Sequence, residues 1–266
     1  MHVYPWRMFA LTMILLSAPL LRGQLSAQEP PPRLTFEVAS IRPSNPEARN
    51  GFIRALPGGY GYAAQNMPVK VMISLMYKVP ERQIKGGPEW LSTARYDVEA
   101  KADKAYNLDD LHTMFQNLLA DRFNLKFHTE TKEGNVYSLT VEKAGLKMKP
   151  NTSEQDFLIP IQFGNDGSSV GKRVPMPYLC WWLGQQLRFD ERPVVDNTGL
   201  TGNFDFTLTF APQLPPDVPR ENLPPDAQDR PSIFEALKQQ LGLRLQPEKG
   251  PVPYLVIDRI ERPSPN

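Results

Sequence analysis

The pattern of apolar and polar residues along the chain predicts short strands and helices in an order that occurs twice. After each of two Met-Pro pairs, Met67-Pro68 and Met176-Pro177, an apolar run leads to an aromatic-Asp pair, Tyr96-Asp97 or Phe204-Asp205. Two later pairs of segments also match: Leu118–Phe127 with Ala236–Leu245, and Tyr137–Leu139 with Tyr254–Val256. The offsets run from 108 to 118 residues, so the register holds apart from one insertion.

In the first copy, apolar residues at helical spacing predict an amphipathic helix over Leu108–Asp121, with Asn107 as its N-cap. Pro68 is placed to open an earlier helix, because its missing N–H has no partner to lose there. The other expected elements are a strand over Thr35–Pro43, a short strand over Tyr60–Ala64, the helix from Pro68 to about Tyr77, an extended piece over Gln83–Lys85, a strand over Arg95–Ala102, and a hairpin of Asn124–Thr131 and Val136–Lys143 around Glu133-Gly134-Asn135.

The second copy follows the same order. Its expected elements are a strand over Val170–Arg173, a helix from Pro177 to about Phe189, strands over Pro193–Val195 and Phe204–Ala211, a helix from Ser232 to Leu241, and a hairpin of Leu243–Gln246 and Val252–Glu261 around Lys249-Gly250. The insertion is Pro212–Pro231, which holds seven prolines and few apolar side chains. Such a segment predicts an exposed, extended loop.

Together these patterns predict an α+β fold of two similar strand-helix-strand-strand-helix-hairpin repeats, with mostly antiparallel sheets and helices packed on them. The expected domains are a signal peptide over residues 1–27, an N-terminal segment with the first repeat over residues 28–150, and the second repeat with its Pro-rich insertion (212–231) over residues 151–266.

The earlier helix of the second copy is apolar on more than one side. Its main face carries Leu179, Cys180 and Leu183, while Trp182 falls to one side and Trp181 lies nearly opposite. A helix that is apolar nearly all round is usually buried on both sides. Burial between the two repeats is the favoured interpretation, and a partner interface anchored by Trp181 is the alternative.

The first 27 residues have the features of an export signal: a charge at Arg7, an apolar run over Met8–Leu21 and a small residue at Ala27. A retained N-terminal anchor is the alternative. Cleavage after Ala27 would leave 28 basic and 29 acidic residues and no further apolar stretch of membrane length. We therefore expect a periplasmic or secreted protein with no membrane span after signal cleavage and no nucleic-acid partner.

Few residues are suited to catalysis. Cys180 is the only cysteine, and His112 and His128 are the histidines outside the leader, so no zinc or Cys-His set is expected. Asp97 and Asp205 occupy matching places in the two copies, which favours a structural role such as binding a backbone N–H. The sequence therefore predicts no catalytic residue, no metal and no cofactor.

The densest local pattern is Pro193–Leu208, in which a tight loop leads into a strand. Asp196 and Asn197 can bond their own downstream backbone, and Gly199 and Gly202 permit positive φ. Loops of this type can also bind ligands. The candidate binding residues are those that the two copies do not share: Trp181, Trp182, Asp196, Asn197, Gly199 and Gly202.

Four segments together resemble a known family: FEVASIRPSNP (36–46), Leu118–Pro150, VVDNTGLTGNFDFTLTFAP (194–212) and Pro231–Asn266. The chain is similar to the exported "soil-associated protein" family, a domain of unknown function with many paralogues in soil bacteria. The resemblance covers almost all of the chain after the leader. It supplies no established catalytic residues, and some relatives attach a similar domain to membrane-bound sensor metalloproteases.

Two hypotheses on function remain. The favoured one is a non-catalytic binding or protein-interaction module of the cell envelope, whose partner is an envelope protein or a small ligand. It predicts an apolar patch or groove near Trp181, Trp182 and the Pro-rich loop. The alternative is a carboxylate-dependent envelope hydrolase, which requires two acids facing each other in a cleft about 5–10 Å apart. The acids available to it are Asp97, Asp196 and Asp205.

Overall fold

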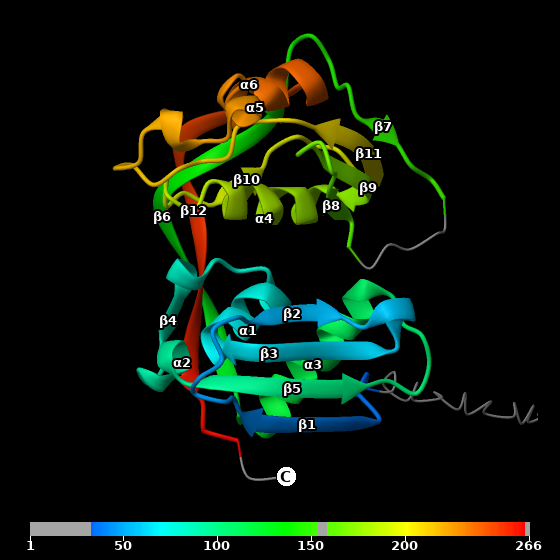
Figure 1. The fold of residues 1–266 in the computed structure, drawn as a ribbon, viewed down its shortest axis with the longest axis vertical. Coiled ribbons are helices and arrows are strands. Elements are labelled where there is room, and N and C mark those ends of the chain that lie inside the picture. The colour runs from blue at the N-terminus through cyan, green and yellow to red at the C-terminus, as the bar shows by residue number, and fades with distance from the viewer. Residues whose placement is uncertain (1–32, 154–158, 264–266) are drawn as a thin grey trace, which may run out of the picture. The chain divides into compact units, whose positions relative to one another are not determined.

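The computed structural model describes residues 33–153 and 159–263, which form helices and three sheets of four strands each (Figure 1). The predicted leader, residues 1–27, lies outside the described residues. From Leu34 onward the chain forms one compact unit. Most strand pairs are antiparallel, which confirms the expected mixture of helices with mainly antiparallel sheets.

The first sheet is antiparallel throughout, and three helices, α1, α2 and α3, contact its strand β3. Its strands in order are β1 (Val38–Pro43), β5 (Arg95–Lys101), β3 (Gly61–Pro68) and β2 (Phe52–Ala55). The accompanying helical segments are η1 (Pro57–Gly59), α1 (Val69–Tyr77), η2 (Glu81–Gln83), α2 (Trp90–Thr93) and α3 (Leu108–Arg122). As expected, α1 follows Pro68 directly, and the Asn107 side chain caps α3 by accepting the Asp110 N–H at 2.8 Å.

A second antiparallel sheet lies in the later half of the chain. Its strands in order are β7 (Lys149–Pro150), β11 (Asn203–Leu208), β9 (Ser169–Pro175) and β8 (Ile161–Phe163). The accompanying helices are α4 (Met176–Gln186), α6 (Ile233–Ala236) and η4 (Leu237–Leu241). Ser232 and Glu235 form a reciprocal capping box at the start of α6, and Gly242 ends η4 with a φ of 67°.

The third sheet contains the two longest strands. Its order is β10 (Val194–Asp196), β6 (Lys126–Val141), β12 (Leu243–Arg259) and β4 (Ile84–Gly86). Strands β6 and β12 are antiparallel along nearly their whole length and run side by side in Figure 1. The short edge strands are parallel to their neighbours: β10 to β6, and β4 to β12. β10 pairs near the C-terminal end of β6, and β4 pairs near the C-terminal end of β12. Because β6 and β12 are antiparallel, the two edge strands lie at opposite ends of this long pair.

The two hairpins predicted around Gly134 and Gly250 do not exist, because β6 and β12 each pass straight through these positions. Gly134 and Gly250 instead lie directly opposite each other, and neither has a positive φ. A Cβ on Gly134 would lie 2.9 Å from Cγ2 of Val252, and one on Gly250 would lie 3.1 Å from Cγ2 of Val136. The glycines therefore leave room for cross-strand valines rather than making turns.

When α2, α5 and the η segments are left aside, part of the element order of the first half is similar to that of the second. The series β3-α1-β4-β5-α3-β6 is followed by β9-α4-β10-β11-α6-β12. In each series the first strand pairs with the third, as β3 pairs with β5 and β9 pairs with β11. A three-residue strand from each half pairs with the long strand of the other half: β4 pairs with β12, and β10 pairs with β6.

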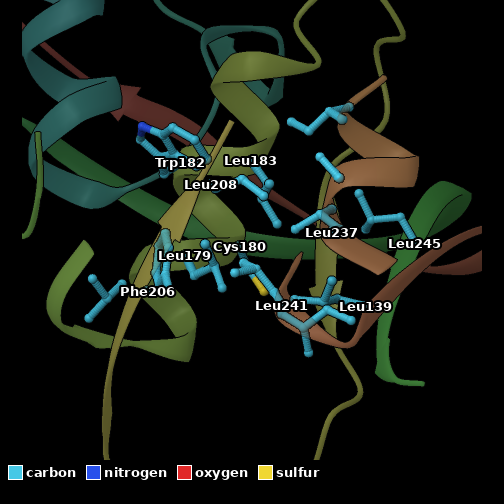
Figure 2. Close-up of a cluster of buried hydrophobic side chains, with 14 of the residues drawn as sticks. Leu139, Leu179, Cys180, Trp182, Leu183, Phe206, Leu208, Leu237, Leu241 and Leu245 are labelled. Carbon is cyan, nitrogen blue, oxygen red and sulfur yellow. The ribbon is translucent and has the colours of Figure 1, made fainter. Parts of the chain in front are cut away.

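Two clusters of buried apolar side chains stabilise the fold, and neither coincides with one half of the sequence. The first contains α1, α3 and the first sheet together with Leu255 and Ile257 from the end of β12. The second contains α4 and the second sheet together with Tyr137 and Leu139 from the end of β6. Figure 2 shows the second cluster, in which Leu183 and Leu208 are fully buried. Burial of such side chains contributes about 1.5–3 kcal/mol each.

The Pro-rich segment Pro212–Pro231 is less extended than its composition predicts. It forms a 3₁₀ turn, η3 (Arg220–Asn222), and a short helix, α5 (Pro225–Gln228). The guanidinium group of Arg220 donates to the carbonyl oxygens of Gln228 and Arg230, which closes the segment on itself. Leu223 and Ala227 are buried within it. Side-chain bonds to the backbone thus supply the order that its few apolar residues alone would not.

Candidate functional site

A mostly apolar cavity of about 330 Å³ lies beside α4, and we call it the Trp181 cavity. Trp181 and Cys180 line it from α4, and Asp196 lines it from the end of β10. Five prolines complete much of its wall: Pro80, Pro177, Pro193, Pro251 and Pro253. The prolines fix the local backbone and present no N–H, so this wall is apolar and rigid. A cavity of this size and character suits a small ligand or a single large side chain.

Trp181 is half-buried, and its ring packs against Tyr178 with 5.4 Å between the ring centroids. Its indole Nε1 is covered by protein and has no hydrogen-bond partner among the described residues. A buried indole N–H usually finds a partner. The side chain is therefore only partly exposed and makes no hydrogen bond to the described residues. It is the largest apolar side chain among the residues that line the cavity.

The loop after β10 is held by its own side chains, as the sequence indicates. The Asp196 carboxylate accepts the backbone N–H of Thr198 at 3.0 Å and its hydroxyl at 2.7 Å. The Asn197 amide donates to the hydroxyl of Ser138 at 2.7 Å. Gly199 and Gly202 have φ values of 68° and 87°, and nothing lies within 4 Å of where their Cβ atoms would be.

Of the six candidate residues, the structure brings Trp181 and Asp196 together in one cavity wall. Asn197 follows Asp196 but points its amide to β6 and lines no part of the cavity. Trp182 belongs to the core cluster that Figure 2 shows and is 6% exposed. Its ring meets that of Phe210 edge-on, with 6.0 Å between the ring centroids. It is therefore a packing residue in this structure and is not accessible to a ligand.

A second, more polar cavity of about 410 Å³ adjoins the first, and we call it the Arg82 cavity. Arg82, Lys85 and Tyr254 line it, and Gln83 and Pro193 line both cavities. The Gln83 side chain is buried and donates to the carbonyl oxygen of Pro253 at 3.0 Å, which fixes the wall that the cavities share. The two cavities therefore adjoin at Gln83 and Pro193.

Arg82 is the unexpected residue of this region. Its Nε and Nη2 atoms are covered by protein and have no hydrogen-bond partner among the described residues. Desolvation lowers the pKa of Arg82, while the nearby charge of Glu191 acts in the opposite direction. A faint sequence signal exists, because the pair Glu81-Arg82 recurs as Glu191-Arg192 within the repeated register.

The acids available to a hydrolase are dispersed over three different sheets, in β5, β10 and β11. The Asp97 carboxylate accepts the backbone N–H of Asn66 at 2.9 Å, and Asp205 accepts that of Arg173 at 2.8 Å. Burial raises the pKa of both carboxyl groups, but the hydrogen bonds outweigh it and hold each pKa below its usual value. This is the expected structural role, and it leaves no facing acid pair among these three residues.

The cysteine and the two described histidines also lie in surroundings that indicate structural roles. Burial raises the pKa of the Cys180 thiol to about 12, so it is protonated and unreactive at neutral pH. His112 is buried, with Nε2 3.2 Å from the Tyr62 hydroxyl, and exposed His128 bonds Asp258 at 2.8 Å. No group of three or more metal-ligating side chains occurs within residues 33–153 and 159–263. In the same ranges no helix has the length and apolarity to cross a membrane.

Comparison with known proteins adds a family to this description. A search of curated proteins found no match, and a search of solved structures found none either. A family model described as "Protein of unknown function (DUF3738)" matches residues 70–260, which run from the second residue of α1 to just past the end of β12. Because this match covers well over half of the chain, the protein belongs to the DUF3738 family.

Proposed function

We propose that this protein is a non-catalytic binding module of the cell envelope and that the Trp181 cavity is its binding site. The observation that carries the proposal is the meeting of Trp181 and Asp196, two independently chosen candidates, in one apolar cavity. Ligand sites are typically concave and apolar with few polar groups. The proline-rich wall supports this further, because a preformed wall lowers the entropy lost on binding.

The envelope location rests on the sequence. The charge at Arg7, the apolar run over Met8–Leu21 and the small residue Ala27 support export to the periplasm or beyond. The resemblance to exported soil-bacterial proteins, and the sensor fusions among those relatives, suit a docking role. Its partner in this proposal is a small ligand or an exposed side chain of an envelope protein.

We also propose that the two halves arose as repeats. The recurring order of elements supports this, as do the matched roles of Asp97 and Asp205. Each of these carboxylates bonds the N–H of a residue with positive φ at a bulge in its sheet, Asn66 at 53° and Arg173 at 52°. In this proposal the repeats build the frame, and the unshared residues supply the site.

The test uses a neutral apolar probe, 3-phenylpropanamide, and the indole N–H resonances of the folded protein. We expect the probe to shift the Trp181 resonance with a Kd of about 1 mM, as for a small fragment in an apolar cavity. Trp181→Phe identifies the resonance by its loss. Trp181→Ala is expected to weaken binding about tenfold or more, since the ring is the main apolar surface.

Trp90→Phe is the matched control, because Trp90 is also half-buried but stacks on Phe123 in the other core cluster. This variant should bind the probe as the unmodified protein does. If the probe shifts no resonance of Trp181 at its solubility limit, or if Trp181→Ala binds it equally well, the proposed site is wrong.

A further inference from the structure

The Arg82 cavity is lined by a guanidinium group with two nitrogen atoms that bond no residue in the described ranges. Buried charges in proteins are normally paired and hydrogen-bonded, because leaving them unpaired is costly. Yet Nε and Nη2 of Arg82 have no partner within the described ranges. The nearby acid is Glu191, which lines the same cavity but forms no ion pair with Arg82 among the described contacts. An exception of this kind calls for an explanation.

The two atoms without partners also have a specific geometry. Nε and Nη2 form one edge of the guanidinium plane, which carries two parallel N–H groups. This edge matches the two oxygens of a carboxylate, which can accept both bonds at once. Protein atoms cover the edge, so an anion in the cavity meets it only when the side chain turns. The arginine side chain has rotatable bonds that permit this turn. The two hydrogen bonds gained with the anion offset the free-energy cost of the turn.

The rest of the cavity suits an organic acid rather than a bare anion. Lys85 lines it and adds a second positive charge, with its ammonium 5.5 Å from the centre of the Tyr254 ring. Tyr254, Val252 and Pro193 add apolar surface. Gln83 and Pro193 also line the Trp181 cavity, so the two cavities adjoin there. One ligand could therefore place a charged end at Arg82 and an apolar body against Trp181.

We infer that the ligand of the Trp181 cavity is a carboxylate with an apolar body, and that Arg82 is the residue that binds its carboxylate. This inference rests on the proposed function, since it assigns the charged end of the same ligand. A free organic acid and the C-terminus of a partner chain share this chemistry.

Arg192 provides a matched comparison within the chain. It follows Glu191 as Arg82 follows Glu81, and it lies at the corresponding place before β10. Its guanidinium carbon stands 5.4 Å from the centre of the Tyr137 ring, and it lines neither cavity. A change at Arg192 therefore removes the same charge from a nearby position without altering the wall of the site.

The experiment compares 3-phenylpropionate with its neutral amide, 3-phenylpropanamide, by calorimetry and by the Trp181 indole resonance. We expect the acid to bind about tenfold more tightly, as for one charge-assisted bidentate contact. Arg82→Gln and Arg82→Lys should each reduce this preference to about twofold or less, because the lysine keeps the charge but lacks the paired N–H groups. Arg192→Gln should retain it.

The amide also reports on the integrity of the cavity. Arg82→Gln should bind the amide as the unmodified protein does, which separates loss of the carboxylate contact from loss of the fold. Glu191→Gln removes a negative charge from the wall and should tighten binding of the acid but not of the amide. A Gly-Gly-Phe peptide with a free C-terminus, compared with its amidated form, tests the chain-terminus source, and preference in either pair supports the inference.

Several results would overturn the inference. Equal binding of acid and amide to the unmodified protein would do so and would leave the Trp181 cavity intact as a binding site. Full preference in Arg82→Lys would show that a point charge suffices, against the bidentate contact. If inorganic phosphate at equal concentration displaced the acid, the natural ligand would belong to another chemical class than the carboxylates. If neither probe binds, both this inference and the proposed function are wrong.

Discussion

Gly134 of β6 and Gly250 of β12 face each other directly in the longest strand pair of the molecule. The chain passes straight through both positions, and each glycine leaves space for a buried valine on the other strand. Val252 and Val136 are 4% and 1% exposed, so neither can move aside into solvent. The pair of glycines thus lets two long strands run closely together past a point where larger residues would collide.

Gly134→Ala should therefore destabilise the protein, although alanine is usually the better strand residue. Its new methyl group would stand 2.9 Å from Cγ2 of Val252, and overpacking of this kind costs about 1–3 kcal/mol. Urea unfolding measures the effect. In a double-mutant cycle, Val252→Ala should make the Gly134→Ala change cost less. Independent, additive effects would contradict the steric explanation.

The sequence predicts local features well where the signal is itself local. Asn107 caps α3 and Ser232 starts α6, because a polar side chain before an apolar helical run needs only its own neighbours to act. The prediction of two hairpins is wrong because long-range pairing, rather than local sequence, decides the conformation there. Glu133-Gly134-Asn135 and Lys249-Gly250 have turn composition, but pairing with a strand more than 100 residues away decides their conformation.

Some residues of the candidate site could likewise be identified from the sequence, while others required the tertiary structure. Trp181 and Asp196 could be chosen from the sequence, because the similar segment of the first half has no tryptophan or aspartate at the corresponding position. Trp182 could not be separated from Trp181 by spacing alone, and the packing of Phe210 against it decides that it is a core residue. Arg82 was missed, because only tertiary burial distinguishes its guanidinium from that of Arg192.

Asp97→Asn and Asp205→Asn should each lower the free energy of unfolding at pH 7 by about 1 kcal/mol, since each carboxylate accepts a backbone N–H. The folded-state pKa of each aspartate lies below its usual value, so its contribution is present above pH 4 and is lost as the pH falls through the folded pKa. The difference from the unmodified protein should therefore shrink at pH 3.

Chemical unfolding at pH 7 and pH 3 measures this dependence. Asp229→Asn is the control, because Asp229 is exposed and lies in the Pro-rich segment, away from both bulges. We expect it to change stability by less than about 0.5 kcal/mol at either pH. If Asp97→Asn and Asp205→Asn cost as much at pH 3 as at pH 7, the ionised carboxylates are not what stabilises the two bulges.

His112 should make the protein less stable in mild acid. Burial lowers its pKa to about 4, and the charge of Lys78 acts in the same direction. The unfolded state therefore binds the proton first, and stability that is complete above pH 6.5 is lost as the pH falls from 6.5 toward 4. The loss could reach about 3 kcal/mol. Unfolding curves between pH 4 and pH 7 should show it.

His112→Gln removes the titrating group and should flatten the dependence in that window, at some cost at pH 7. His128→Gln is a control of opposite sign, because the hydrogen bonds that the exposed His128 ring donates to Asp258 and Glu130 raise its pKa. Proton NMR should find the His112 ring titrating near pH 4. A midpoint above pH 6 would contradict the burial of a neutral imidazole.

A larger side chain at Gly184, which lines the Trp181 cavity, should fill that cavity. Gly184 lies inside α4, and an added Cβ would meet nothing within 4 Å. Gly184→Ala should stabilise the protein by about 0.5–1 kcal/mol, as expected for glycine replaced within a helix. Gly184→Leu should keep the fold and abolish binding of 3-phenylpropanamide, because its side chain takes the place of the probe.

Gly242→Ala gives the contrasting result for a glycine that the backbone requires. Its φ is 67°, and a Cβ would stand 2.1 Å from the carbonyl oxygen of Gly145, so this change should destabilise the protein by more than about 1 kcal/mol. Unfolding curves and probe titrations of the three variants separate the cases. A Gly184→Leu variant that folds and still binds the probe would place the binding site elsewhere, because the cavity it fills could no longer hold a ligand.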